Sequence, residues 1–213
     1  MYLPTHFEES RIGVLQALMR EHPFATLVTK TKGGEGLTAN HLPLHLEPEA
    51  GPFGVLQGHV ARANPVWQQM SGSEILVIFH GPQAYVTPSW YETKREHGKA
   101  VPTWNYVVVH AHGRLRAIDD ADWLLGNLEA LVAHHEAGFA EPWQVGDAPP
   151  EYIDKMLTAI VGIEIEITEL KGKWKTSQNQ PPANRTGVVA GLRSLGTADA
   201  AAMADLVAGT LLP

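Results

Sequence analysis

Alternating hydrophobic and polar residues dominate the first half of the chain, and this period of two predicts β-strands. Pro43 has no N–H for a ladder, so its strand should lie at a sheet edge or point the missing donor away from the neighbouring strand. Glycines at residues 33–36 predict a turn between the first two strands, and Gly81-Pro82 predicts a second hairpin. Strands are expected at about residues 24–30, 41–46, 54–62, 75–79, 84–87 and 104–112.

Helical periodicity opens the sequence and is frequent after residue 118. Thr5 and Glu8 have the spacing of a capping box, and Thr197 can cap the second half of the C-terminal tail. We expect the charged residues 92–100 and residues 141–150 to form loops. Residues 163–168 alternate between apolar and polar side chains, which predicts a half-buried strand. Helices are expected at about 6–21, briefly after Asn64-Pro65, at 119–135 and 151–160, and in two segments over 182–212.

These elements predict one fold class, α+β but mainly β, because no helix long enough for a parallel crossover separates the early strands. We find no internal repeat and no polar linker, so we expect a single domain over residues 1–213 with a helical C-terminal tail from about 182. A signal peptide pattern and an apolar run of bilayer length are missing, which predicts a cytoplasmic protein without a membrane partner.

The amino-acid composition excludes several kinds of functional site. The 213 residues contain no cysteine, which excludes thiolate metal sites, iron–sulfur clusters and cysteine nucleophiles. A net charge of −7 argues against extended contact with nucleic-acid phosphates. No dinucleotide fingerprint or phosphate-binding loop motif is present. Eleven His and six Trp therefore draw attention to proton handling and to stacking of a flat ligand, although Trp is also a good core residue.

Two histidine pairs, His41/His45 and His110/His112, have spacings that invite a metal hypothesis. In extended backbone the first pair lies about 13 Å apart, too far for one ion, and the second pair needs a third ligand from elsewhere. We therefore expect surface or hydrogen-bonded histidines and no metal. Ser89 lies outside any nucleophile elbow, so a serine hydrolase is not expected.

Two other patterns leave alternatives open. The alternate lysines of residues 171–175, followed by hydroxyl and amide side chains, suit an anion, but they also suit an edge strand protected against aggregation. Residues 59–65, 81–91 and 101–106 mix aromatic with small polar side chains. They would line a site for a flat, partly polar ligand, or they form an aromatic core with ordered turns.

Several strings resemble the PaiB family, described as FMN-binding negative transcriptional regulators, in the expected order and over nearly the whole chain. The strings are Tyr2-x-Pro4-x-His6-Phe7, His41-Leu42-Pro43-Leu44, Gly58-His59-Val60-Ala61-Arg62-Ala63-Asn64-Pro65-x-Trp67, Gly81-Pro82-x-Ala84-Tyr85-Val86-x-Pro88-Ser89-Trp90-Tyr91, Val101-Pro102-Thr103-Trp104-Asn105-Tyr106 and Ser177-Gln178-Asn179. The resemblance implies a split β-barrel of antiparallel strands with peripheral helices, a homodimer, and FMN near the dimer interface.

By analogy with related split barrels, the cofactor would face two strands and a following segment. Arg62 is the first choice for the phosphate, because a planar cation with several donors suits a dianion. Lys175-Thr176 departs from the Lys-Leu that the resemblance leads us to expect. The implied FMN contacts are Asn40, His41, Leu42, His59, Ala61, Arg62 and Asn64, with Thr103, Trp104 and Asn105 for the ring and Lys175, Ser177 and Gln178 as a second cluster reaching across the dimer.

The resemblance leaves the biological role open between three readings. The family description implies a transcriptional regulator, but we find no helix-turn-helix and no base in residues 198–212, so we expect weak, non-specific DNA binding at most. An FMN-dependent oxidoreductase of a small molecule fits the same fold. Haem binding through a histidine is a third alternative, since some split barrels use haem.

Overall fold

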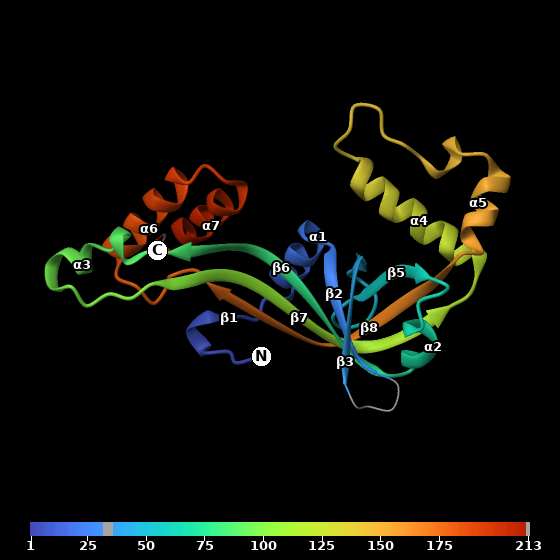
Figure 1. Ribbon diagram of the computed structural model, residues 1–213, viewed down its shortest axis with the longest axis horizontal. Helices are drawn as coiled ribbons and strands as arrows, with labels where there is room; N and C mark the ends of the chain where they lie inside the picture. Colours follow the sequence, from blue (N-terminus) through green and yellow to red (C-terminus); the bar gives the residue numbers. More distant parts are fainter. Residues whose placement is uncertain (32–35, 212–213) are drawn as a thin grey trace. The chain divides into compact units, whose positions relative to one another are not determined.

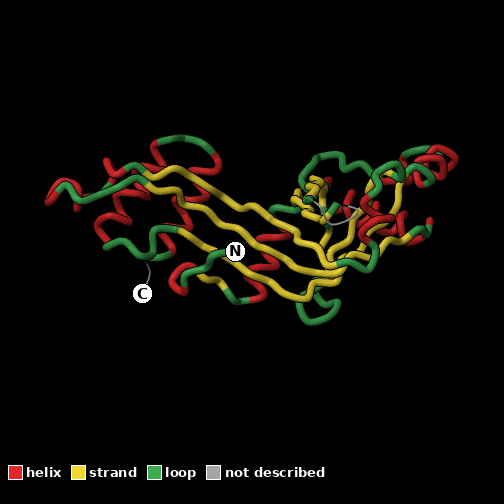
Figure 2. The backbone as a smooth tube through the Cα atoms, turned by 60° about the horizontal axis from the view of Figure 1, so that its bottom comes forward, coloured by secondary structure: helices red, strands yellow, loops and turns green. Residues whose placement is uncertain are grey.

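The computed structural model describes residues 1–31 and 36–211, and its main feature is a large antiparallel sheet (Figure 1). Among the described residues the strand order is β3-β2-β6-β7-β8-β5-β4, with β1 paired to β8. Figure 2 shows β6, β7 and β8 as long neighbouring strands. The strands are β1 Glu8–Glu9, β2 Phe24–Lys30, β3 Leu37–Pro43, β4 His45–Glu47, β5 Val55–Ala61, β6 Glu74–Val86, β7 Thr103–Ile118 and β8 Ile160–Lys175.

Helices accompany the sheet, and short 3-10 turns occupy Thr5–Phe7, Pro88–Trp90 and Val145–Asp147. No helix among the described residues is both long and apolar enough to cross a bilayer. The α-helices are α1 Ile12–Glu21, α2 Val66–Met70, α3 Glu92–His97, α4 Ala121–Glu136, α5 Pro150–Leu157, α6 Pro182–Ser194 and α7 Ala198–Gly209.

The contacts divide the chain into two compact units, each built from separate stretches of sequence. Unit 1 contains residues 1–11, 80–109 and 171–213, and unit 2 contains residues 12–79 and 110–170. The strands β6, β7 and β8 each contribute residues to both units. The expectation of one domain over the whole chain stays a prediction.

Unit 2 has an aliphatic core in which side chains from its strands face α1 and α4. Leu27, Leu56, Val161 and Ile163 are fully or almost fully buried there. Helix α4 approaches the sheet closely because residue 162 is a glycine, and a Cβ at Gly162 would lie 2.4 Å from the ring of Trp123. Burying this apolar face stabilises the unit and fixes the position of α4.

Unit 1 is built around the packing of α6 against α7, which lie side by side in Figure 1. Val188 and Leu192 of α6 and Met203 and Val207 of α7 are completely buried. The side chain of Thr197 accepts a hydrogen bond from the N–H of Ala200, as the sequence predicts for a cap.

Most predicted elements are present. The α+β class with a mainly antiparallel sheet is confirmed, as are β2, β5, α4, α5 and the two C-terminal helices. β3 ends the sheet order, which confirms the edge position predicted from Pro43. Most of the predicted 33–36 turn, and the end of the predicted tail helix at residue 212, lie outside the described residues.

Two expectations about local structure are wrong at the N-terminus and at Gly81-Pro82. The first helix begins at Ile12 rather than residue 6, because Glu8–Glu9 pairs with β8 and the Glu9 carboxylate accepts hydrogen bonds from Arg11. The chain does not reverse at Gly81-Pro82, where β6 continues. The buried positions change from odd to even numbers there, which is the one-residue phase shift of a bulge rather than a turn.

Two further boundaries also differ. Residues 92–97 form helix α3 instead of a loop. Glu92 lies in its first turn, basic residues lie in its last turn, and Gly98 ends it at φ +70°, so charge and cap both favour a helix. The strand predicted at 163–168 is the middle of a longer strand, β8, which also contains the alternating lysines.

Candidate functional site

Unit 1 brings two of the predicted groups together, one at the start of β7 and one at the end of β8. The Lys175 ammonium donates hydrogen bonds to the Thr103 hydroxyl at 2.5 Å and to the Trp104 carbonyl at 2.8 Å. The Asn105 amide donates to the Ser177 hydroxyl at 2.9 Å, and both of these side chains are buried. Residues 72 positions apart in sequence therefore form one polar cluster.

A second ammonium lies beside this cluster. Lys173 is buried, donates to the Tyr2 carbonyl at 3.1 Å, and lies 5.6 Å and 5.3 Å from the ring centroids of Tyr2 and Tyr106. Burial lowers the pKa of Lys175, and repulsion from Lys173 lowers it further, while Tyr106 opposes the shift. Two cations held by carbonyl, hydroxyl and aromatic groups form a corner that an anion would stabilise.

Ser177 and Gln178 shape the backbone next to the two lysines. Ser177 has φ +62°, in the left-handed region that L-residues seldom adopt. The Gln178 side chain accepts from the N–H of Thr176 at 2.8 Å and donates to the Trp174 carbonyl, so it braces this turn. The carbonyl oxygen of the Asn105 side chain is buried without a hydrogen-bond partner in the described structure. It is an acceptor that a ligand N–H would satisfy.

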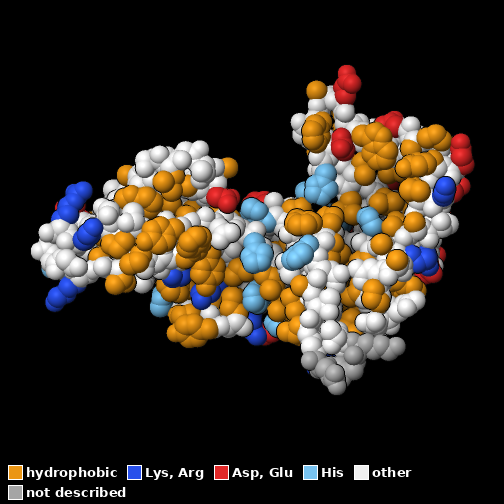
Figure 3. Space-filling model, in the orientation of Figure 1, with side chains coloured by type: hydrophobic (Ala, Val, Ile, Leu, Met, Phe, Trp, Pro, Cys, Tyr) orange, Lys and Arg blue, Asp and Glu red, His pale blue; other side chains and the backbone are white. Residues whose placement is uncertain are grey.

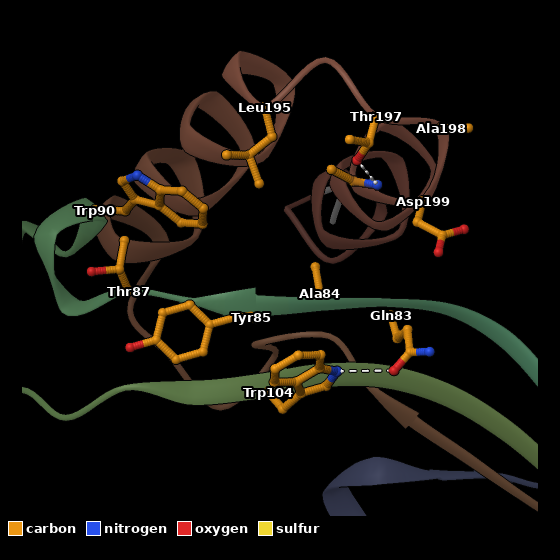
Figure 4. Close-up of a pocket in the computed structure, with 11 residues that line it drawn as sticks. Gln83, Ala84, Tyr85, Thr87, Trp90, Trp104, Leu195, Thr197, Ala198 and Asp199 are labelled. Atoms are coloured by element: carbon orange, nitrogen blue, oxygen red, sulfur yellow. Dashed lines mark hydrogen bonds between the residues drawn. The ribbon is translucent and has the colours of Figure 1, made fainter.

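An aromatic groove with a cavity volume of about 800 Å³ lies in the same unit (Figure 4). Tyr85 and Trp104 meet edge to face with ring centroids 6.1 Å apart, and the Trp104 indole donates to the Gln83 side chain at 3.2 Å. Both rings are about half exposed, at 49% each. Trp90, Leu195 and the start of α7 line the rest, and hydrophobic side chains gather over this part of β6 and β7 in Figure 3.

Trp90 belongs to the aromatic stretch 81–91 that the sequence analysis named, but it is not among the FMN contacts that the resemblance implies. A Cβ at Gly191 would lie 2.2 Å from its indole ring, and a Cβ at Gly187 would lie 1.9 Å from its carbonyl oxygen. The two glycines are four residues apart on α6 and therefore share one face of the helix. This spacing is a signal in the sequence for close approach of a large side chain.

The predicted group on β3 and β5 lies in unit 2. The side-chain amide nitrogen of Asn64 donates to the side-chain oxygen of Asn40 at 2.8 Å, and the side-chain oxygen of Asn64 accepts from the N–H of Val66 at 3.0 Å. The Asn40 amide nitrogen is buried without a partner in the described structure. Leu42 is buried in the core, whereas Ala61 is exposed.

The two histidines of this group differ in environment. His41 Nδ1 lies 3.1 Å from the Thr26 hydroxyl at an exposed site. His59 is half-buried, and its Nδ1 has no hydrogen-bond partner among the described residues. Burial lowers the pKa of His59, and the Asn127 side chain opposes the shift. No group of three or more His, Asp or Glu within residues 1–31 and 36–211 is arranged to hold a metal ion.

Arg62, the residue first chosen for the phosphate, is engaged in a different way. Its guanidinium donates to both carboxylate oxygens of Asp119, at 2.6 and 2.9 Å, and to the carbonyls of Thr158 and Ile160 at 2.8 and 3.0 Å. These four bonds leave one of its five N–H groups without a partner here. A phosphate at Arg62 would have to compete with Asp119.

Comparisons with known proteins match this chain over most of its length. Residues 1–169 match the family described as "Putative FMN-binding domain". The chain is 36% identical to an uncharacterized protein of Emericella nidulans, over 97% of this chain and 96% of that protein. It is 31% identical to the protease synthase and sporulation protein PAI 2 of Bacillus subtilis, with the same coverages.

Solved structures agree in fold. The FAD and heme binding protein from Mycobacterium smegmatis aligns with a TM-score of 0.57 at 17% identity, covering 79% of this chain and 73% of that one. Flavocytochrome Anf3 from Azotobacter vinelandii aligns with a TM-score of 0.56 at 15% identity, covering 79% and 69%. The predicted split-barrel class and the resemblance to PaiB are confirmed. The protein belongs to the family described as "Putative FMN-binding domain".

Proposed function

We propose that this protein binds FMN and that the flavin phosphate contacts Lys175 and Lys173. Family membership supports the cofactor. The observation that carries the position is the pair of neighbouring ammonium groups, whose hydrogen bonds go to the neutral Thr103 hydroxyl and the Trp104 and Tyr2 carbonyls. A phosphate dianion would offset the repulsion between the two lysines, and the charge-assisted hydrogen bonds it accepts are about twice as strong as neutral ones.

The aromatic groove supports a place for the ring in the same unit. Trp104 belongs to both features, since its carbonyl holds Lys175 and its indole lines the groove. A volume of about 800 Å³ lies within the range of small-molecule and cofactor sites. Asn105 offers a buried acceptor for an N–H of the ring. A bound flavin would supply electron transfer, while the protein supplies orientation and electrostatics.

The predicted group on β3 and β5 lies in unit 2 and is a separate candidate site from the one in unit 1. Asn40 and His59 each carry a buried polar nitrogen without a partner in the described structure, so they are the members of this group that a ligand would satisfy. The side chain of Leu42 is already buried, and Asn64 is occupied by Asn40 and Val66. We therefore expect substitutions of Asn40 to affect flavin binding more than substitutions of Leu42 or Ala61.

We further propose a homodimer that acts on transcription through its flavin rather than by reading DNA bases. The apolar segment Val107–Val109 offers no surface for a dimer, because its side chains are buried within the chain itself. The support is instead the exposed apolar surface of unit 1, which includes Tyr85, Val101 and Trp104. Light scattering that gives twice the chain mass of 23.2 kDa would support the dimer, and a stable monomer would contradict it.

The flavin proposal is tested by titrating FMN and riboflavin, which lacks the phosphate, and following flavin fluorescence. Lys175→Met should weaken FMN binding by roughly tenfold or more, the equivalent of about 1.5 kcal/mol for a hydrogen bond to a charged group. Riboflavin binding should be nearly unchanged. Lys155→Met removes an exposed lysine of α5 and is the matched control, and Arg62→Ala tests the alternative phosphate contact.

Each outcome decides a separate point. If the wild type binds neither flavin, the cofactor proposal fails. If Lys175→Met weakens FMN and riboflavin equally, Lys175 supports the pocket and not the phosphate. If Arg62→Ala weakens FMN selectively while Lys175→Met does not, the phosphate lies at Arg62. Circular dichroism melts of all variants separate loss of binding from loss of folding.

A further inference from the structure

A second cavity, of about 570 Å³, lies in unit 2 and has no part in the flavin proposal. One wall is a single face of α4, because residues spaced by three and four positions share a helix face. The other wall is the segment at residues 142–146 that follows the helix. The α4 residues that line the cavity are Glu129, Val132, Ala133 and Glu136, and Ala137 directly follows the helix.

The charge of this cavity is negative. Glu129 and Glu136 are the ionisable residues of the described lining, which includes no Lys, Arg or His. The Glu136 carboxylate accepts a hydrogen bond from the N–H of Trp143 at 2.9 Å, whereas the side chain of Glu129 has no hydrogen bond or ion pair in the described part of the chain. The cavity also lies at the C-terminal end of α4, where the helix dipole adds partial negative charge. His134 and His135 belong to the same last turn but do not line the cavity.

The remaining lining is apolar. Trp143 is 44% exposed, and Pro142, Val145, Ala133 and Ala137 surround it. Acidic and hydrophobic side chains lie together over α4 and the following loop in Figure 3. An indole face attracts cations through its quadrupole even at an exposed site such as this one, and the nearby carboxylates add to the attraction.

We propose that this cavity binds a small organic cation, an ammonium ion that carries an alkyl or aryl body. The two carboxylates, the helix C-terminus and the indole all favour positive charge, and the alanine, valine and proline side chains accommodate the apolar body. The volume falls within the usual range for small-molecule sites. An anionic flavin phosphate would be repelled, so this inference does not depend on FMN binding.

The probe is choline, compared with its neutral isostere 3,3-dimethylbutan-1-ol at matched ionic strength. Binding is followed by the NMR resonance of the Trp143 indole N–H, assigned as the signal lost in Trp143→Leu. Choline should shift this resonance saturably, and the neutral isostere should bind at least tenfold more weakly. Glu129→Gln should weaken choline two- to fivefold. Glu141→Gln, which removes an exposed carboxylate of the same loop outside the lining, is the matched control and should have no effect.

Three results would overturn the proposal. They are the absence of a saturable shift with choline, equal binding of the neutral isostere, and an equal effect of Glu129→Gln and Glu141→Gln. The last result would show that general surface charge, and not this cavity, attracts the cation. The spectrum of each variant without ligand confirms that it is folded.

Discussion

Arg62 and Asp119 form a bidentate ion pair, with Nη2 2.6 Å from one carboxylate oxygen and Nη1 2.9 Å from the other. The same guanidinium donates to the backbone carbonyls of Thr158 and Ile160. Arg62 therefore ties the end of β5 to the start of β8 and to the segment that leads into α4. This arrangement gives a structural role to a residue whose chemistry alone suggests phosphate binding.

Arg62→Ala should therefore lower the melting temperature by several degrees, because it removes four hydrogen bonds at once. Asp119→Asn should cost less, since it leaves the bonds to the two carbonyls in place. Arg95→Ala is the control, because Arg95 makes one exposed ion pair with Glu92. If Arg62→Ala lowers the melting temperature no more than Arg95→Ala does, the hydrogen bonds of Arg62 do not stabilise the fold.

Gly191→Ala should destabilise unit 1 by about 1–3 kcal/mol, because the new methyl group overlaps the Trp90 ring. Gly126→Ala is the matched control on α4, where a Cβ meets no atom within 4 Å. That change should stabilise its helix by up to about 1 kcal/mol through helix propensity. Urea unfolding measures both values. Similar effects of the two substitutions would contradict the close packing of Trp90 on α6.

The stability of the protein should decrease below about pH 6.5, partly because of His59. Burial lowers the pKa of His59 in the folded state, so the unfolded state binds a proton more readily between the two pKa values. The contribution of His59 is fully present above the unfolded pKa and is lost as pH falls towards the folded pKa. Urea unfolding of His59→Gln across this range should show a flatter profile than the wild type. An unchanged slope in His59→Gln would contradict the assignment.

Ser177→Ala should destabilise the chain more than Ser177→Gly does. Both substitutions remove the hydroxyl that Asn105 donates to and leave a buried amide unsatisfied, which costs about 1–3 kcal/mol. Glycine alone adopts φ +62° without steric penalty, which offsets roughly 1 kcal/mol of that loss. Chemical denaturation of the two variants gives the comparison. The opposite order would show that the left-handed conformation at Ser177 is not strained.

Local patterns in the sequence were sufficient for much of the fold and for the family. The alternation of Phe24–Lys30 and the Thr197 cap of α7 depend on neighbouring residues, and both are present. The family strings likewise lie within short windows, and the comparisons confirm the membership they imply. Periodicity failed at Gly81-Pro82, because a bulge and a turn use the same residue types.

Only the tertiary structure decided which polar groups are free to bind a ligand. The family resemblance pointed to Arg62, Lys175 and Asn105, but the sequence contained no sign that Asp119 and two backbone carbonyls bind Arg62. Lys175 instead has neutral partners on a strand some 70 positions earlier, because the sheet brings β7 beside β8. Side-chain donors compete for acceptors in three dimensions, and the outcome depends on contacts between segments far apart in the chain.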